Sequence, residues 1–440
     1  MSRTVSAPAR RRHCADDGAG ACAARALRLV SPASFPPAVA PLDRHVPAPF
    51  AAHCNATPVS GSAHFVAAHG HGDGWNLSFA EPCAVHVAER LDQLAGLFAR
   101  AQAAADDGRW VALAVAYEAA PAFDSALAVR APRGSASAPL AWAAEYRAPS
   151  PTPSSIAAAG QGDYRVGEWR SQLPRDDYLA AIARIREYIR AGDCYQVNFT
   201  FPLRADFSGD ARRWFADLCR SQRAGYGAYL DLGRQRLLSL SPELFFARRG
   251  GRLYARPMKG TAPPGSNAAE TRAAAAALAA SEKDRAENLM IVDLLRNDLS
   301  RVAATGTVRV PRLFEIEHYP TVLQMTSSIE ADCAPDADLW TLFRALFPCG
   351  SISGAPKVRS MQIIAELECA PRGFYCGAIG YLAPGGDCAF NVPIRTVQLD
   401  VDSGSADYGT GSGVTWGSLG DAEYDECLLK TRFLHAATGC

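Results

Sequence analysis

Apolar and polar positions recur along the chain with the spacing of helices in five segments. Asp176 and Asp177 precede a run of apolar residues at helical spacing, and Gly192 follows it. Acidic residues favour the first turn of a helix and glycine favours its end, so this segment is predicted to be a capped helix. Further helices are predicted at residues 86–105, 267–302 with a break near Ser281, 355–367 and 421–436.

Other segments show the apolar runs and two-residue alternation that are typical of strands. Strands are predicted at residues 110–117, 194–204, 226–232, 236–248, 252–258, 307–310, 375–383, 388–400 and 405–415. Helices and strands follow one another without strict alternation and without an internal repeat, which argues against a Rossmann-type fold. The order predicts an α+β architecture with largely antiparallel sheets.

The regions of the chain differ in composition. Residues 1–60 are rich in Ala, Arg and Pro and lack apolar periodicity, so a disordered extension is expected there. An organellar transit peptide is the alternative, whereas a secretory signal would need a continuous apolar stretch. Residues 61–147 are predicted to form an N-terminal region, residues 148–162 a linker or loop, and residues 163–440 the main domain.

Composition and charge narrow the classes of function. Hydrophobic residues make up 48% of the 440 residues and charged residues 20%, the balance of a globular protein with a core. The net charge is zero, and no run reaches the ~18 apolar residues of a membrane span, so neither a nucleic-acid nor a membrane partner is expected. The 13 cysteines form no C-x-x-C pair, which indicates reduced thiols in a cytoplasmic protein.

Lysine is rare in this chain. Only four of the 45 basic residues are lysines: Lys259, Lys283, Lys357 and Lys430. In such an alanine- and arginine-rich sequence, a remaining lysine is a candidate for chemistry that needs a neutral amine, such as nucleophilic attack. Chance survival of a surface lysine is the alternative. Lys259 ends a predicted strand, and the following Gly260 would allow a ligand to approach closely.

Two predicted helices carry carboxylates on faces that could point into a site. Glu287 shares a helical stripe with Ile291, and Glu423, Glu426 and Lys430 recur on one face of the last helix. A buried carboxylate needs a partner charge or a metal. Mg²⁺ prefers oxygen ligands and keeps positions open for water or substrate, so two helix-borne carboxylates would suit it. A partly exposed, salt-bridged face is the alternative for each helix.

Two glycine-rich segments could bind anions. Residues 349–357 lead into a predicted helix, where backbone N–H groups and the hydroxyls of Ser351 and Ser353 could meet a carboxylate or phosphate. Their spacing is not that of a P-loop. Residues 408–414 could form a nest of backbone amides or simply a tight hairpin. Arg395 could clamp a carboxylate with two hydrogen bonds, or could face outward from its strand.

The order of these motifs is similar to that of the chorismate-utilising enzymes, the anthranilate synthase component I-like family. The resemblance covers about residues 165–436 and rests on several segments. They are Gly192–Asn198, Ser241–Glu243, Pro257–Thr261, Lys283–Leu294, Gly350–Lys357, Ile394–Thr396 and Gly411–Lys430.

The resemblance implies two facing, largely antiparallel sheets with surrounding helices, and makes residues 163–440 the chorismate-binding catalytic domain. It implies that Glu287 and Glu426 hold Mg²⁺ against a carboxylate of chorismate, with Glu423 and Gln196 in supporting roles. Lys259 would be the catalytic residue. The substrate-binding residues that the resemblance implies are Ser353, Tyr381, Arg395, Gly411, Ser412, Gly413 and Lys430.

Three positions select among the reactions of the family. Anthranilate-forming members usually carry alanine at the position of Lys259 and a histidine at that of Gln324. Members that aminate chorismate carry lysine at the first position, and it attacks ring C2 before ammonia adds at C4. Members that add water carry a lysine at the position of Gln196, where a glutamine amide cannot act as a base. The resemblance therefore implies Mg²⁺-dependent amination of chorismate to 4-amino-4-deoxychorismate.

The resemblance also implies partners. We recognise no Cys-His-Glu glutaminase region and no lyase domain in this sequence. A separate glutamine amidotransferase subunit is therefore expected to supply ammonia, and a separate lyase to form 4-aminobenzoate for folate. The alternatives are anthranilate formation and a non-catalytic chorismate-binding relative.

Overall fold

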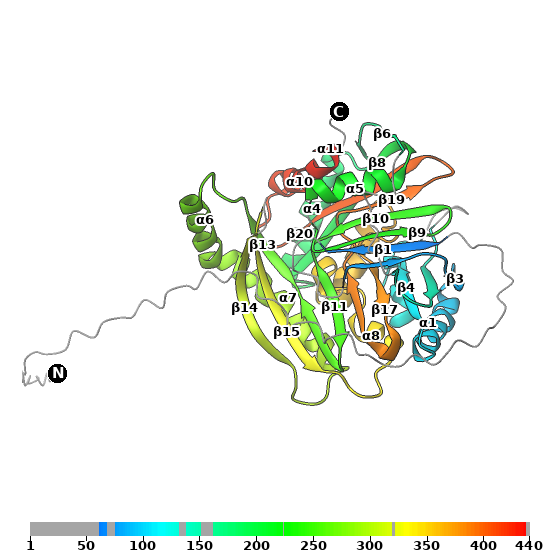
Figure 1. Cartoon of the computed structure of the whole chain (residues 1–440). Coiled ribbons are helices and arrows are strands. Elements are labelled where there is room, and N and C mark those ends of the chain that lie inside the picture. The colour runs from blue at the N-terminus through cyan, green and yellow to red at the C-terminus, as the bar shows by residue number, and fades with distance from the viewer. Residues whose placement is uncertain are drawn as a thin grey trace, which may run out of the picture. The chain divides into compact units, whose positions relative to one another are not determined.

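The computed structural model describes residues 61–67, 75–131, 138–150, 162–222, 224–318 and 322–436. The chain divides into two units, and all the described residues belong to the unit at residues 34–440. The extension predicted at residues 1–60 lies outside the described residues, as do residues 151–161 of the predicted linker. Two β-sheets with helices packed against them make up the described part (Figure 1).

The first sheet has ten strands among the described residues, and its longest is β8 (Gln196–Gly209), next to one end of the strand order. Its other strands are β1 (Ser62–Val66), β2 (Leu77–Phe79), β6 (Tyr164–Val166), β7 (Arg170–Ser171), β9 (Tyr226–Asp231), β10 (Gln235–Ser241), β16 (Gly354–Ala355), β19 (Thr396–Asp400) and β20 (Ser405–Val414). They run in the order β16-β8-β20-β19-β10-β9-β1-β2, and β6 and β7 also pair with β8. β20 pairs with β8 along its whole length, from Ser405 opposite Asp206 to Val414 opposite Val197.

The second sheet also has ten described strands. They are β3 (Ala84–Ala88), β4 (Trp110–Val115), β5 (Ala141–Tyr146), β11 (Leu244–Arg249), β12 (Arg252–Arg256), β13 (Met258–Ala262), β14 (Arg309–His318), β15 (Leu323–Asp332), β17 (Ala378–Leu382) and β18 (Cys388–Asn391). Their order is β13-β15-β12-β11-β18-β17-β4-β5-β3, with β14 on β15. Strands from residues 61–147 thus take part in both sheets.

The sheets face each other, and helices cover their other sides. Because side chains alternate across a strand, Val111, Leu113 and Val115 of β4 pack under helices, whereas Ala112 and Ala114 point between the sheets. The helices on the second sheet are α1 (Leu91–Asp106), α7 (Glu282–Ser300) and α8 (Leu339–Leu346). Those on the first are α4 (Arg175–Arg190), α5 (Ala211–Gln222), α9 (Lys357–Leu367), α10 (Gly420–Leu429) and α11 (Arg432–Ala436).

The predicted α+β architecture with largely antiparallel sheets is confirmed, since the strand pairings described in both sheets are antiparallel. The predicted break near Ser281 is also confirmed. α6 (Ala268–Ala280) ends there, and the Ser281 hydroxyl accepts a hydrogen bond from the Asp284 N–H to cap α7. The predicted helix at 86–105 began too early, because residues 84–88 form β3 and pair with β5. The last predicted helix is interrupted between α10 and α11.

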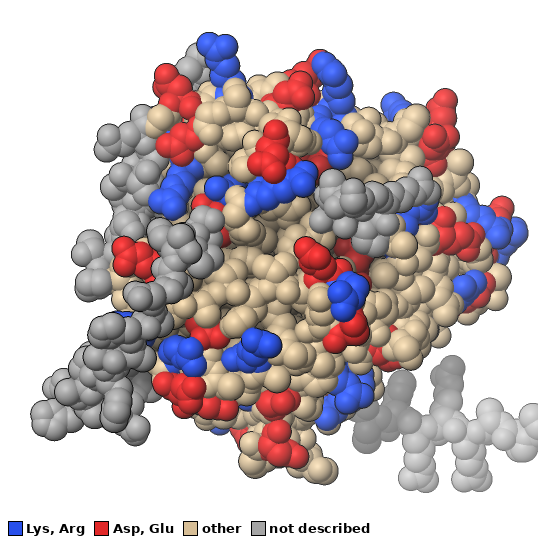
Figure 2. Space-filling model, turned by 90° about the vertical axis from the view of Figure 1, so that its right-hand side faces the viewer, with Lys and Arg blue, Asp and Glu red and all other residues tan. Residues whose placement is uncertain are grey.

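α5, α8 and β15 are among the elements that were not predicted from the sequence, as are the short strands β1, β2, β3, β5, β6 and β7. β15 buries the polar side chains of Gln324 and Thr326, so the sequence of this buried strand lacks the continuous apolar run that would predict it. Among the described residues, no helix combines the length and the apolar character that a membrane span requires. Figure 2 shows that basic and acidic side chains are interspersed on one face, as the zero net charge leads one to expect.

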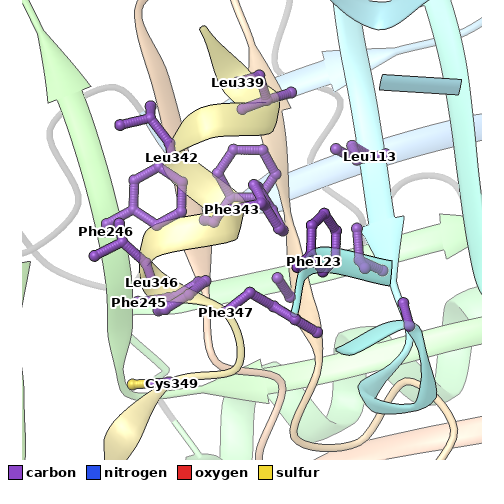
Figure 3. Packing of buried hydrophobic residues seen from close by; sticks show 14 of the residues in the cluster. Leu113, Phe123, Phe245, Phe246, Leu339, Leu342, Phe343, Leu346, Phe347 and Cys349 are labelled. Carbon is purple, nitrogen blue, oxygen red and sulfur yellow. The ribbon is translucent and has the colours of Figure 1, made fainter. Parts of the chain in front are cut away.

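Aromatic side chains fill the core beneath α8. Leu339, Leu342, Phe343 and Leu346 recur at helical spacing and turn one face of α8 inward (Figure 3). The Phe343 ring lies 4.9 Å from the Phe98 ring of α1, between ring centroids. It also lies 5.1 Å from the Phe390 ring of β18 and 5.7 Å from the Phe246 ring of β11. One side chain therefore joins two helices to two strands of the second sheet.

Phe343→Ala is expected to lower the free energy of unfolding by about 3–5 kcal/mol, because a buried aromatic ring is lost and a cavity is left. Equilibrium urea unfolding measures the change. Val401→Ala is the control, since Val401 is 44% exposed and its truncation should cost less than about 0.5 kcal/mol. A cost below about 1 kcal/mol for Phe343→Ala would contradict this view of the core.

Candidate functional site

Three segments that lie far apart in the sequence meet at Lys259. Lys259 is in β13, Gln196 is the first residue of β8, and Gly413 is near the end of β20. A Cβ atom on Gly413 would lie 2.9 Å from Lys259 Nζ and 2.2 Å from Gln196 Nε2. A side chain at position 413 would therefore displace the amine and the amide from these positions.

The Lys259 amine is held in a partly desolvated position. Burial disfavours its charged form and lowers the pKa of Lys259 below the ordinary lysine value, and the charge of Lys430 acts in the same direction. The carboxylates of Glu287, Glu243 and Glu426 raise this pKa without cancelling the effect of burial. An amine with a lowered pKa is more often neutral near pH 7, as a nucleophile or base must be.

Glu287 extends from α7 into the same surroundings. Burial raises the pKa of Glu287, while Lys259 and Lys283 lower it, and the side chain is 18% exposed. The Lys283 ammonium is 3.9 Å away, which is a weak ion pair. The next residue, Asn288, accepts a hydrogen bond from the Ser327 hydroxyl at 2.5 Å and so fixes α7 on β15. Glu287 is therefore a largely buried carboxylate whose described ion pair, with Lys283, is weak.

α10 brings a second set of charges to the site. Lys430 Nζ lies 2.8 Å from Glu426 Oε1 and donates a hydrogen bond to the Gly411 carbonyl at 2.8 Å. Burial raises the pKa of Glu426, but the charge and hydrogen bond of Lys430 outweigh it, so that pKa ends below its ordinary value. Glu423 is buried one turn earlier, and its charge raises the pKa of Glu287. The face of α10 predicted from spacing thus acts on Glu287 of α7.

The glycine-rich segment of β20 leaves one of its edges open. On one side Gly411, Ser412 and Gly413 pair with β8, whereas on the other β19 pairs with β20 only as far as Tyr408. β19 starts after Arg395, whose positive φ of 51° turns the chain. Beyond Tyr408, β20 therefore has no described strand partner on this side, and Thr410, Gly411 and Ser412 are buried there.

Ser353 and Ser412 are used mainly to fix the backbone. The Ser353 hydroxyl donates to the Cys349 carbonyl at 3.1 Å, and the Ser353 carbonyl accepts from the Asn198 N–H at 2.9 Å. The Ser412 hydroxyl lies 3.2 Å from the Tyr178 hydroxyl. Both serines are buried, and they hold the turn at 350–353 and strand β20 against β8 and α4.

Tyr381 lies in a different part of the fold from the residues around Lys259. Its ring centroid is 5.6 Å from that of Phe65 and 5.8 Å from that of Trp75, in the cluster between the sheets. Another tyrosine, Tyr375, is closer to the glycine-rich strand. A Cβ atom on Gly409 would lie 2.2 Å from Cδ1 of Tyr375.

The sequence analysis gave no role to Glu243, which the structure places near Lys259. Glu243 follows β10, is 3% exposed, and its Oε1 has no hydrogen-bond partner among the described residues. Burial raises the pKa of Glu243 to about 7, although a hydrogen bond with Ser351 and the charge of Lys259 lower it. A carboxyl group with this pKa can give or take a proton near neutral pH. The sequence signals were a glutamate within the long apolar stretch 236–248 and its place in Ser241–Glu243, one of the segments that carry the resemblance.

Glu243 should make the stability of the fold depend on pH. In the folded protein Glu243 keeps its proton up to about pH 7, whereas in the unfolded chain it titrates near its ordinary pKa of 4.5. Its contribution to the unfolding free energy is therefore complete below pH 4.5 and is lost as the pH rises through 7. Burial also raises the pKa of Glu118 to about 7, so two groups share the effect.

Glu243→Gln is expected to reduce the fall in unfolding free energy between pH 5 and pH 8.5 by roughly 3 kcal/mol or less, because the amide does not titrate. Urea unfolding at the two pH values measures this difference, with Glu118→Gln as the comparison. If the unfolding free energy of Glu243→Gln falls between these pH values as much as that of the unmodified protein, then Glu243 is ionised at both.

The chain is similar to known proteins in sequence and in fold. The family model of the chorismate binding enzyme matches residues 71–436. Aminodeoxychorismate synthase component 1 of Salmonella typhimurium is 41% identical over 295 residues, 67% of this chain and 63% of the relative. Anthranilate synthase component 1 of Thermus thermophilus is 37% identical over 299 residues, 68% of this chain and 63% of the relative. The chain thus matches less than two thirds of the length of either relative.

The fold is shared with a solved structure. Anthranilate synthase component I from Streptococcus pneumoniae TIGR4 matches with a TM-score of 0.66 at 21% identity, over 88% of this chain and 94% of that one. The resemblance seen in the sequence is therefore confirmed at the level of family and fold. Since the family model spans most of the chain, the protein belongs to the chorismate binding enzyme family.

Proposed function

We propose that this chain is component 1 of an aminodeoxychorismate synthase, which converts chorismate and ammonia to 4-amino-4-deoxychorismate. The observation that carries the proposal is Lys259, an amine with a lowered pKa that lies against Gly413, as the Gln196 amide also does. The Salmonella typhimurium relative of that name supports the choice of reaction.

The proposed reaction uses Lys259 as a nucleophile. Its neutral amine forms a bond to ring C2, the ring double bonds shift, and the bond from C4 to its hydroxyl breaks. The hydroxyl leaves as water with a proton from Glu243, whose pKa of about 7 keeps the proton available near neutral pH. Ammonia then forms a bond to C4, the double bonds shift back, and the Lys259 amine leaves C2 with its electron pair. A proton of the new C4 ammonium returns to the ionised Glu243.

Gln324 supports the lysine strand in this proposal. Its Nε2 donates to the Gly260 carbonyl at 2.9 Å, and its Oε1 accepts from the Thr261 hydroxyl at 3.0 Å. The side chain therefore holds the residues that follow Lys259. The Gln324 amide is neutral and cannot act as an acid or a base, as a histidine could. This difference favours amination over a reaction that needs a histidine at this position.

We also propose that Glu287 and Glu426 hold Mg²⁺ together with oxygens of the substrate. The fit rests on Glu287, a largely buried carboxylate whose nearest described cation is 3.9 Å away, so that a divalent ion would relieve its burial. Among the described residues, no three His, Cys, Asp or Glu side chains are grouped as a complete metal site, so substrate and water would complete the shell. The ion would neutralise substrate carboxylate charge.

Ammonia is proposed to come from a separate glutamine amidotransferase subunit, and a separate lyase to convert the product to 4-aminobenzoate for folate. The designation component 1 of the Salmonella typhimurium relative supports a second subunit. The nine free cysteines of the described residues support a reducing, cytoplasmic setting.

The reaction is tested with chorismate, Mg²⁺, an ammonium salt and an added lyase, by measuring 4-aminobenzoate. We expect this product, and a rate lower by roughly 100-fold or more for Lys259→Ala because the nucleophile is lost. Lys259→Arg is the matched control that keeps the charge but not the neutral amine, and it should be as slow. Anthranilate in place of 4-aminobenzoate would contradict the proposal.

The metal site is tested by titrating Mg²⁺ into the protein with chorismate in a calorimeter. Glu287→Gln and Glu426→Gln are each expected to weaken Mg²⁺ binding roughly 10–100-fold, because each removes a charged oxygen ligand. Glu89→Gln, at an exposed position away from the site, should leave the affinity unchanged. Equal Mg²⁺ affinity in all three variants would place the ion elsewhere.

A further inference from the structure

Arg372 is buried behind the site, and all three of its guanidinium nitrogens donate hydrogen bonds. The residue is 5% exposed. Nη1 donates to the Ile352 carbonyl at 2.8 Å and Nη2 to the Asn198 carbonyl at 2.7 Å. Nε and Nη2 also bond the Glu368 carboxylate at 3.0 and 2.6 Å. One guanidinium thus connects the turn at 350–353 with strand β8.

Glu368 attaches the same group to β8 at a second point. Its Oε1 accepts from both the N–H and the hydroxyl of Thr200, each at 2.9 Å. Thr200 lies opposite Gly411 of β20, and Asn198 lies opposite Gly413. The Arg372–Glu368 pair is therefore bonded to the part of β8 that supports the glycine-rich segment.

The N-terminal region holds Arg372 from the other side. Tyr117 and Glu118 belong to the short helix η1 (Tyr117–Ala119), which follows β4. The Glu118 carboxylate accepts from the N–H groups of Arg372 at 2.7 Å and Gly373 at 2.9 Å. The guanidinium carbon lies 4.4 Å from the centroid of the Tyr117 ring. A residue 254 positions away in sequence thus anchors the arginine backbone.

A buried charge set of this kind is a poor source of stability, because removing the charges from water costs as much as their attraction returns. Its distinct property is geometric. A planar guanidinium fixes the two carbonyls of Ile352 and Asn198 at a set separation, which a lysine or an apolar residue of equal volume cannot do. Ser353 is the last residue of this turn, and Gln196 is the first residue of β8. The two segments are joined directly by the hydrogen bond from the Asn198 N–H to the Ser353 carbonyl.

We propose that Arg372, held by Glu368 and Glu118, is a positioning residue that sets the spacing between the turn at 350–353 and β8, and thereby the affinity for the substrate. No contact of Arg372 with Lys259 is described, so the residue acts on binding and not on the chemical step. The proposal rests on the proposed function only in taking chorismate as the substrate.

The test separates binding from turnover in the full chain. For Arg372→Lys we expect the KM and the calorimetric Kd for chorismate to rise roughly 10-fold, with kcat within about threefold, because the charge stays while the bridge between two carbonyls is lost. Arg234→Lys is the control, since Arg234 pairs with Asp400 at the surface, and both constants should stay unchanged. An unchanged KM and Kd, or a fall in kcat alone, would overturn the proposal.

Two milder variants decide the matter if Arg372→Lys does not fold. Thr200→Val removes one donor to Glu368 without changing volume, and Glu118→Gln keeps one of the two acceptor oxygens. Each is expected to raise the Kd for chorismate roughly threefold, and an unchanged Kd in both would overturn the proposal. Because Kd is measured by calorimetry, a protein that binds chorismate but forms no 4-aminobenzoate would contradict the proposed function and leave this test intact.

Discussion

Keeping the Lys259 amine partly out of water, next to a strand backbone, is the constraint on which the rest of the site depends. An ammonium in such a position must be compensated by carboxylates or give up its proton, and here burial outweighs the three glutamates that act on it. The contact also requires a strand without a side chain at 413, which β20 supplies. The long pairing of β20 with β8 then places the Gln196 amide at the same point.

Both sheets contribute to this arrangement, which is why the residues of the candidate site are spread along the chain. The second sheet and α7 carry Lys259 and Glu287, whereas the first sheet and α10 carry Gly413 and Glu426. Opposite charges from the two halves thus meet, and the pKa values of Lys259 and Glu426 are both below their ordinary values. Both pKa shifts are in the direction that a lysine nucleophile and a metal-binding glutamate need.

Local patterns predicted those features that depend on local spacing. The break at Ser281 and the single face of Glu423, Glu426 and Lys430 follow from helix geometry alone. The surroundings of Glu243 did not follow, because burial and a pKa of about 7 arise from strands that are distant in sequence. The same holds for the bond between Glu118 and the Arg372 N–H, for which no short motif exists.

The pKa of the Lys259 amine is the most direct test of this account. With only four lysines in the chain, ¹³C labelling at the lysine ε carbon gives four NMR signals, and Lys259→Arg identifies one by its loss. The account predicts that this signal titrates below the ordinary lysine pKa of about 10.4. A midpoint at or above that value would show that the glutamates dominate, and that Lys259 is a fixed positive charge instead of a nucleophile.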